Sequence, residues 1–125
     1  MEPFDLAKPA ITEVFFNSLR QLACINGYNG HFLAANPAFV AALGWSEAEL
    51  RDLPYYELLM PTERRSMIKL GASIVRNAGS EPGTYRRAFR HKNGSYRLIE
   101  WTSWPAPQAR LVCSTGRVLA AVEPR

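Results

Sequence analysis

The sequence contains few of the residues from which metal centres and disulfide frameworks are built. Among 125 residues it has two cysteines and two histidines. Cys24 and Cys113 lack the Cys-x-x-Cys spacing of a zinc ligand pair and have no histidine pair near them. Both lie in apolar, strand-like runs, where a free thiol behaves as a small hydrophobic side chain. We therefore expect buried, inert thiols and no metal site.

Long apolar runs are also lacking. The longest, residues 32–45, is interrupted by Asn36 and Pro37 and is too short to cross a bilayer. No stretch resembles a signal peptide. With 47% hydrophobic and 21% charged residues, the composition is that of an ordinary globular protein. The sequence predicts one domain, located in the cytoplasm, with no membrane partner.

A catalytic constellation is missing as well. His31 lies beside a predicted turn and His91 at a predicted hairpin end, and local spacing gives neither an acidic or thiol partner. The carboxylates are scattered over loops and helix starts, where negative charge is favoured. We therefore expect a protein that is not an enzyme.

The net charge of +4 raises the question of nucleic-acid binding. Much of the excess positive charge falls in residues 64–76 and 86–97, and neither cluster has the interleaved aromatic residues and recognition helix of a groove-binding protein. Solvated helix and hairpin faces are the simpler interpretation, and no nucleic-acid partner is expected.

What the sequence does contain is a dense set of helix start and stop signals between Gly30 and Leu50. Asn36 can cap a helix whose first position is Pro37, and Gly44 can end it. Ser46 and Glu49 then have the spacing of a capping box. These signals predict short helices wrapped around a core or pocket.

The remaining periodicities predict an α+β domain. Residues 9–20 form an amphipathic helix, and residues 62–77 form a longer one. The Asn93-Gly94 pair marks a hairpin turn. The expected fold is a five-stranded antiparallel sheet with the short helices and the longer helix on one face, preceded by the N-terminal helix. The predicted strands are residues 22–26, 31–35, 85–91, 96–104 and 111–115.

The fourth predicted strand carries apolar residues on both of its faces. Leu98 and Trp104 lie on one face, and Ile99 and Trp101 on the other. A strand with one face in water alternates more cleanly. We therefore expect the second face of the sheet to be covered, either by the helix at residues 9–20 or by a second subunit.

These motifs together resemble those of PAS domains. The first half of the pattern is Asn29-Gly30, then Asn36-Pro37-Ala38-Phe39, then Leu43-Gly44-Trp45-Ser46-x-x-Glu49-Leu50. The second half is Arg90-x-Lys92-Asn93-Gly94-Ser95-Tyr96-Arg97, then Glu100-Trp101 and Gly116-Arg117. The resemblance divides the chain into a flanking helix (1–21), a PAS domain (22–118) and a C-terminal tail or linker start (119–125).

The resemblance implies a sensory module whose helices and sheet enclose a pocket. An apolar or aromatic ligand would receive one or two hydrogen bonds from Tyr55, Tyr56 or Thr102. The alternative is that the same apolar residues simply fill the core. The candidate pocket residues are Phe39, Leu43, Tyr55, Met67, Leu70, Ile74, Trp101 and Cys113.

The resemblance also constrains the cofactor, which the sequence does not name. Haem-binding relatives usually supply a histidine from the long helix, but residues 62–77 contain none. Flavin-adduct relatives carry a cysteine in the segment that here reads Leu53-Pro54-Tyr55-Tyr56-Glu57-Leu58. Conventional haem and covalent flavin chemistry are therefore not expected, whereas a non-covalently bound flavin in a redox sensor stays an alternative.

The function that the resemblance implies is sensing and dimerisation in bacterial-type signalling, such as a two-component system. The expected partners are a second copy, packed through Ile11, Phe15 and Leu19, and an effector: a histidine kinase, a cyclic-dinucleotide enzyme or a transcription regulator. Many family members follow the final Gly-Arg with Asp-x-Thr, but this chain continues Val118-Leu119-Ala120, so the usual output coupling does not carry over. A ligand-free protein-interaction domain is the alternative.

Overall fold

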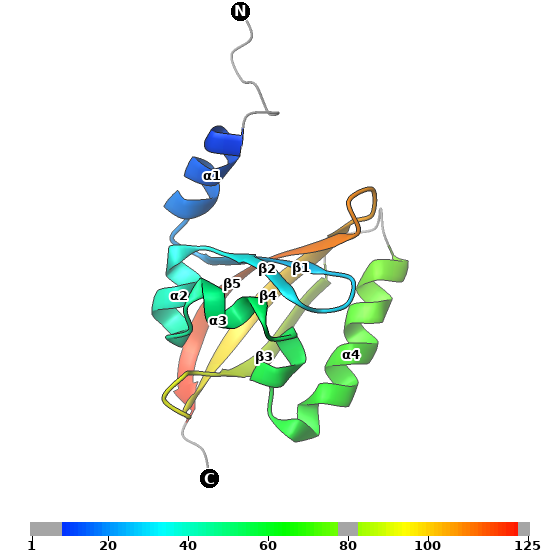
Figure 1. Cartoon of the computed structure of the whole chain (residues 1–125). Coiled ribbons are helices and arrows are strands. Elements are labelled where there is room, and N and C mark those ends of the chain that lie inside the picture. The colour runs from blue at the N-terminus through cyan, green and yellow to red at the C-terminus, as the bar shows by residue number, and fades with distance from the viewer. Residues whose placement is uncertain (1–8, 78–82, 123–125) are drawn as a thin grey trace, which may run out of the picture.

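The computed structural model describes residues 9–77 and 83–122, and these form a five-stranded antiparallel sheet with helices on one face (Figure 1). The strand order is β2-β1-β5-β4-β3, which confirms the predicted α+β architecture. The helices are α1 (Pro9–Ser18), α2 (Pro37–Leu43), α3 (Glu47–Arg51), the 3-10 helix η1 (Tyr55–Leu58) and α4 (Pro61–Arg76). The strands are β1 (Leu22–Gly27), β2 (Phe32–Ala35), β3 (Gly83–Arg90), β4 (Tyr96–Ala106) and β5 (Leu111–Val122).

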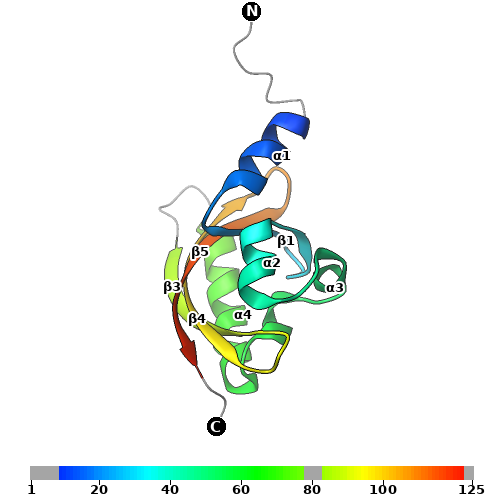
Figure 2. The same ribbon diagram turned by 90° about the vertical axis from the view of Figure 1, so that its left-hand side faces the viewer.

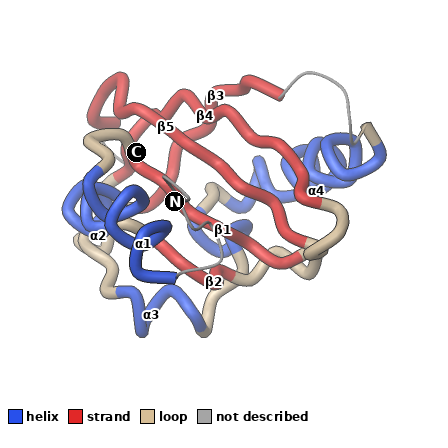
Figure 3. Tube along the Cα trace, turned by 90° about the horizontal axis from the view of Figure 1, so that it is seen from above, coloured by secondary structure: helices blue, strands red, loops and turns tan. Residues whose placement is uncertain are grey.

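The helices divide the covered face of the sheet between them. Helices α2, α3 and α4 lie on the same side of the sheet (Figure 2). Seen from above, α2 and α3 lie toward one end and α4 toward the other (Figure 3). The long helix predicted at residues 62–77 is α4, and Ala78 and Gly79, with which we expected it to end, lie outside the described residues. Within the described part of the chain, no helix is long and apolar enough to span a membrane.

The predicted capping signals of α2 and α3 are confirmed. The Asn36 side chain accepts a hydrogen bond from the Phe39 N–H at 3.0 Å, and Pro37 occupies the first turn. Gly44 ends α2 with a φ of 78°, and a Cβ there would come within 2.7 Å of the His91 ring. Ser46 and Glu49 form both bonds of the capping box.

Asn36 also joins three separate segments of the chain. Its side-chain oxygen accepts a second hydrogen bond, 2.9 Å long, from the Ala23 N–H of β1. Its amide nitrogen donates to the carbonyl oxygens of Gln21, at 2.9 Å, and Phe16, at 3.3 Å. The residue is 0% exposed, so water cannot replace these partners. One amide therefore fixes the end of α1, the start of β1 and the start of α2.

The β3–β4 hairpin turn is docked against the loop between α2 and α3. The Lys92 N–H donates to the Leu43 carbonyl oxygen, and the Trp45 indole N–H donates to the Arg90 carbonyl oxygen, both at 2.9 Å. The Lys92 ammonium lies 2.8 Å from the Glu49 carboxylate. These bonds lock one end of the domain.

The open face of the sheet differs from the prediction. Helix α1 extends beyond the edge of the sheet and does not lie over this face (Figures 1 and 2). Val14 and Phe15 of α1 are each 69% exposed, Leu19 after it is half-buried, and the side chain of Ile11 lies outside the described residues. Residues 9–77 and 83–122 therefore do not provide the cover that the apolar outer residues of β4 suggested.

Part of this open face is polar. Glu100 of β4 lies between Arg86 of β3 and Arg117 of β5, with N···O distances of 3.0 and 3.1 Å. Hydrogen bonds from Arg117 and Arg86 lower the pKa of Glu100. Trp104 on the same face is 37% exposed. A charged row therefore lies beside an apolar patch.

Strand β5 is longer than predicted. The expected end was Thr115, but the strand continues to Val122. Its added residues pair with the first half of β4, with Arg117 opposite Glu100 and Val122 opposite Tyr96. The sequence signal was the absence of a glycine or proline from Arg117 to Val122, a run that contains two β-branched valines.

We predict that Asn36→Ala lowers the free energy of unfolding by on the order of 3 kcal/mol, since it leaves several buried backbone groups without partners. Urea unfolding of the two proteins measures the difference. The matched control is Ser46→Ala, which removes an exposed cap and should cost about 1 kcal/mol. Equal losses for both variants would contradict the role given to Asn36.

We also predict a pH-dependent contribution from Glu49. Hydrogen bonds from Lys92 and from the Ser46 N–H lower the pKa of Glu49 from 4.5 to about 2. A carboxyl group with a lowered folded-state pKa stabilises the fold above its unfolded pKa, and loses that contribution as the pH falls through the folded value. The stability difference between wild type and Glu49→Gln should therefore shrink as the pH falls from 4.5 toward 2.

Chemical unfolding across this pH range measures the difference. Lys92→Met removes the same ion pair from the other side, so adding Glu49→Gln to it should produce a smaller pH-dependent change. A stability difference between wild type and Glu49→Gln that stays constant over this window would show that the pair contributes nothing.

Candidate functional site

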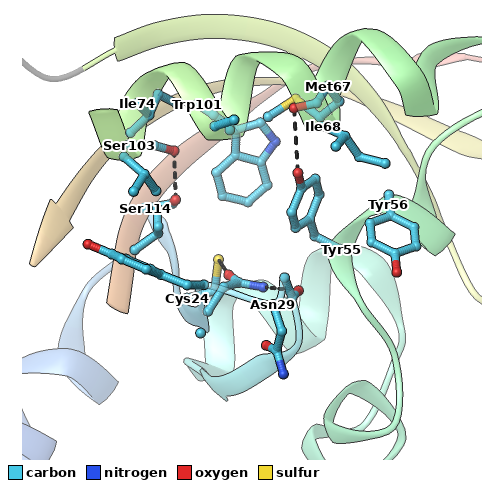
Figure 4. Close-up of a pocket in the computed structure, with 18 of the residues that line it drawn as sticks. Cys24, Asn29, Tyr55, Tyr56, Met67, Ile68, Ile74, Trp101, Ser103 and Ser114 are labelled. Atoms are coloured by element: carbon cyan, nitrogen blue, oxygen red, sulfur yellow. Dashed lines mark hydrogen bonds between the residues drawn. The ribbon is translucent and has the colours of Figure 1, made fainter. Parts of the chain in front are cut away.

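A cavity of about 610 Å³ lies between α4, the β1–β2 turn and the covered face of the sheet (Figure 4). Helix α4 has only two buried side chains in its 16 residues, Met67 and Ile74. The helix therefore touches the sheet without closing over it. The volume is within the range of ligand pockets, which are mostly about 300–1,000 Å³.

The floor of the cavity is a row of small residues that crosses all five strands. From β3 to β2 the paired residues are Gly83, Ser103, Ser114, Cys24 and Ala35. Three of them, Ser103, Ser114 and Cys24, line the cavity. Because none of these side chains rises far above the sheet, space remains over Ser103, Ser114 and Cys24, whereas Ile74 of α4 lies close to Gly83 at the β3 end of the row.

The neighbouring row on the same face is aromatic. Tyr85 of β3 pairs with Trp101 of β4, and Trp101 pairs with Gly116 of β5. A Cβ at Gly116 would come within 2.6 Å of the indole ring, so the glycine gives Trp101 room beside β5. Trp101 also contacts Phe89, with 5.2 Å between ring centroids. This aromatic row forms a rigid wall beside the small-residue floor.

The α4 side of the cavity depends on a close contact with η1. Tyr55 donates a hydrogen bond of 3.4 Å from its hydroxyl to the Met67 carbonyl oxygen. A Cβ at Gly71 would lie 2.9 Å from that hydroxyl, so a larger residue there would displace it. Met67 and Ile74 face inward, whereas Ile68 lines the cavity with 47% of its surface exposed. The helix thus offers an adaptable, apolar wall (Figure 4).

Polar groups are grouped at two places in this apolar space. The hydroxyls of Tyr85, Ser103 and Ser114 form a chain, with 2.7 Å between each neighbouring pair of oxygens. Burial raises the pKa of Tyr85 to about 12, so its hydroxyl stays protonated. The other place is the indole N–H of Trp101, which is buried and has no hydrogen-bond partner. The cavity therefore presents donors.

Reactive chemistry is not built into these walls. Burial raises the pKa of Cys24 to about 12, so its thiol is a poor nucleophile. In the described part of the chain, no group of three or more His, Cys, Asp or Glu residues could hold a metal ion. Arg76 is the one charged side chain among the described residues that line the cavity. The arrangement is suited to holding a largely apolar molecule.

The structure brings together half of the predicted pocket residues. Tyr55, Met67, Ile74 and Trp101 line the cavity, as does Tyr56. Phe39 and Leu43 are 0% exposed and belong to the core under α2, because their helix lies at the other end of the sheet. Leu70 is half-buried and packs against that core without lining the cavity.

Cys113 and Thr102 lie on the opposite face of the sheet. Cys113 pairs with Trp104 and Ile25, and it directly precedes Ser114, which faces the cavity. Successive side chains of a strand point to opposite faces, so placing Cys113 in the pocket was wrong by one residue. Thr102 directly follows Trp101 and is excluded for the same reason.

Several polar residues of the cavity were missed, among them Ser103, Tyr85, Ser114 and Asn26. Ser103 could have been found from the sequence, since it lies two residues after Trp101 on the same strand and so shares its face. Tyr85 and Ser114 required the pairing of β3, β4 and β5. Asn26, which donates from its amide to the Gly30 carbonyl oxygen at 2.9 Å, required the geometry of the β1–β2 turn.

The structure is similar to several solved domains. No protein-family model matches the sequence, and no curated protein matches it. A domain of a sensory box sensor histidine kinase/response regulator from Geobacter sulfurreducens has a TM-score of 0.75 and 23% identity, over 86% of this chain and 91% of that chain.

Two further likenesses carry the PAS description. A PAS domain from Colwellia psychrerythraea has a TM-score of 0.77 and 18% identity, over 88% of this chain and 95% of that chain. The PAS domain of the quorum-sensing receptor RpfR from Cronobacter turicensis, in complex with BDSF, has a TM-score of 0.70 and 17% identity, over 82% of this chain and 97% of that chain. The motifs, the strand order and these likenesses agree, and the chain is a domain of the PAS fold.

Proposed function

We propose that this domain is a sensory module that binds a small apolar or aromatic ligand in the cavity between α4 and the sheet. The observation that carries the proposal is the floor of small side chains below a helix with two buried residues. Protein interiors are close-packed and leave few voids larger than a water molecule, so this partly open space of about 610 Å³ is not a packing void of the core.

Ligand-bound relatives support this assignment. The RpfR PAS domain has been solved in complex with BDSF and with C12:0, a fatty acid. At 17% identity these structures show that the same fold accommodates such molecules. The fit of such a ligand in this chain depends on the residues that line its own cavity. Here the walls are apolar and aromatic, which suits a ligand with a hydrocarbon or ring body.

A ligand would act by joining parts of the domain that now touch weakly. It would contact Met67 and Ile74 on α4, the floor residue Ser114 on β5, and Tyr55 on η1. A signal requires the bound and free states to differ in their affinity for a partner. Movement of α4 toward β5 on ligand binding would alter β5. Because β5 also forms part of the open face, the affinity of that face for a partner would then differ between the bound and free states.

We further propose that this open face and α1 bind a second copy of the chain in the cytoplasm, next to an effector such as a histidine kinase, a cyclic-dinucleotide enzyme or a transcription regulator. Phe15 and Val14 of α1 are each 69% exposed, and Trp104 on the open face of β4 is 37% exposed. Large apolar side chains grouped on a surface mark interaction sites. Similarity to a sensor histidine kinase domain supports the choice of effector.

The ligand proposal predicts that native mass spectrometry of freshly purified protein detects a reproducible bound mass that denaturation releases. Ser114→Leu raises the floor of the cavity and should remove most of that bound mass. The matched control, Cys113→Leu, adds a similar volume on the opposite face and should retain the bound mass.

Absence of any bound mass in the wild type, together with no binding of added apolar compounds, would favour a ligand-free interaction domain. Release of a flavin from a yellow sample would identify the redox alternative.

The dimer proposal predicts that Phe15→Asp shifts the protein from dimer to monomer in sedimentation velocity, because the charge would have to be desolvated in the interface. Leu19→Asp should act in the same direction. Asn17→Asp places the same charge on an exposed polar position of α1 and should leave the dimer intact. An unchanged sedimentation coefficient for Phe15→Asp would show that α1 is not part of an interface.

A further inference from the structure

The indole N–H of Trp101 is the most unusual polar group in the cavity. Trp101 is 1% exposed, and its nitrogen has no hydrogen-bond partner. Figure 4 shows this nitrogen on the edge of the ring that points toward Met67 and Tyr55. By contrast, the Trp45 indole donates to the Arg90 carbonyl oxygen at 2.9 Å. The indole nitrogen can only donate, so an acceptor is what Trp101 lacks.

The surrounding side chains do not provide that acceptor. The Tyr55 hydroxyl donates to the Met67 carbonyl oxygen and forms no hydrogen bond with the indole. The rings of Phe39 and Phe89 lie 6.0 and 5.2 Å from the Trp101 ring and offer no oxygen or nitrogen. The thioether of Met67 is a weak acceptor, but its flexible side chain can move aside. A molecule in the cavity can therefore reach the indole after a small adjustment of Met67.

A second group in the cavity also has a donor to spare. The three hydroxyls of Tyr85, Ser103 and Ser114 carry one proton each, and the two hydrogen bonds between them use two. Burial keeps the Tyr85 proton in place by raising its pKa to about 12. Each of the two places thus keeps one unused donor, and a ligand that carries acceptors can satisfy both.

The charge of the cavity restricts the kind of acceptor. Of the described lining residues only Arg76 is charged, and it is an exposed residue in the last turn of α4. Trp101 is instead deep in the domain, among aromatic rings. A carboxylate placed there would be desolvated without a counter-ion, which is strongly unfavourable. A neutral acceptor avoids that penalty.

We propose that Trp101 is the specificity-determining residue of the cavity, and that its N–H binds a neutral acceptor, a carbonyl oxygen or ring nitrogen, on a ligand with an otherwise apolar body. This inference rests on the proposed sensory function. It adds the chemical class of the ligand, which is a neutral ketone, ester, amide or heteroaromatic compound. A plain hydrocarbon lacks the acceptor, and an anion beside the buried Trp101 indole would be desolvated.

The test uses three bicyclic compounds of similar size: 1-tetralone, which has a carbonyl, tetralin, which lacks it, and 1-naphthoate, which carries a charge. Each is titrated into the full chain labelled with ¹⁵N-tryptophan, and the indole N–H signals are followed by NMR. Trp45→Phe and Trp104→Phe each remove one signal and thereby identify that of Trp101. We expect 1-tetralone to bind about three- to tenfold more tightly than tetralin, the range of one net hydrogen bond, and to shift the Trp101 proton downfield.

Variants separate the hydrogen bond from the shape of the cavity. Trp101→Phe keeps an aromatic ring without the donor and should make the two affinities equal. Trp104→Phe, on the same strand but the opposite face, should preserve the preference for 1-tetralone. If Trp101→Phe does not fold, the downfield shift of the Trp101 signal in the wild-type protein decides the question.

Each remaining outcome would overturn the role of Trp101, the neutrality of the ligand or the proposed function. Equal binding of 1-tetralone and tetralin, with no change at the Trp101 indole, would overturn the role of Trp101 and leave the proposed ligand cavity intact. Tightest binding by 1-naphthoate would overturn the neutral-ligand inference in the same way. Failure of all three compounds to bind would overturn the inference together with the proposed function.

Discussion

The fold depends above all on the buried amide of Asn36. It satisfies backbone groups at the end of α1, in β1 and at the start of α2, where no water reaches. A buried polar group of this kind is stable only when every partner is in place, so it enforces one arrangement of the segments it joins. The β3–β4 turn adds its own bonds to the loop between α2 and α3. One end of the domain is therefore fixed by directional bonds, which leaves the opposite end, under α4, free to be a binding site.

The cavity at that end follows from the order of side-chain sizes across the sheet. One row of paired residues is small in every strand, and the next row contains Tyr85 and Trp101. Helix α4 reaches the small row at Gly83, beside Ile74, and leaves space above Ser103, Ser114 and Cys24. The rigid core does not deform to fill that space. Gly116 contributes by letting the Trp101 indole lie beside β5, where any Cβ would collide with it. The same two rows thus create the space and furnish its donors.

The sequence predicted best what is decided locally. The caps at Asn36 and Ser46, the stop at Gly44 and the turn at Asn93-Gly94 each depend on a few neighbouring residues, and all are present. Strand pairing is decided by residues distant in the sequence, and an error of one residue places a side chain on the wrong face of the sheet. Cys113 was assigned to the cavity in this way, although Ser114 lines it. Phe39 and Leu43 were assigned to it because core and pocket walls have the same composition. The cover of the open face was expected to be either helix α1 or a second subunit, because an apolar face shows that cover is needed but does not show what provides it.

The two ends of the domain are connected by the strands in its centre, so the floor of the cavity is continuous with the segments that Asn36 joins. Cys24 of β1 and Ser114 of β5 are paired on the cavity floor. Ala23, next to Cys24, is bonded to Asn36, and Thr115, next to Ser114, lies on the open face with Cys113 and Arg117 as its alternate neighbours. A ligand that pulls α4 toward β5 therefore acts on strands that also contact the start of α2 and form the exposed surface. Helix α4 buries two side chains, accepts one hydrogen bond from Tyr55, and is joined to η1 and β3 by the ion pairs Arg64–Glu57 and Glu63–Arg87. A molecule bound under it would therefore add buried contacts to a helix that has few of them.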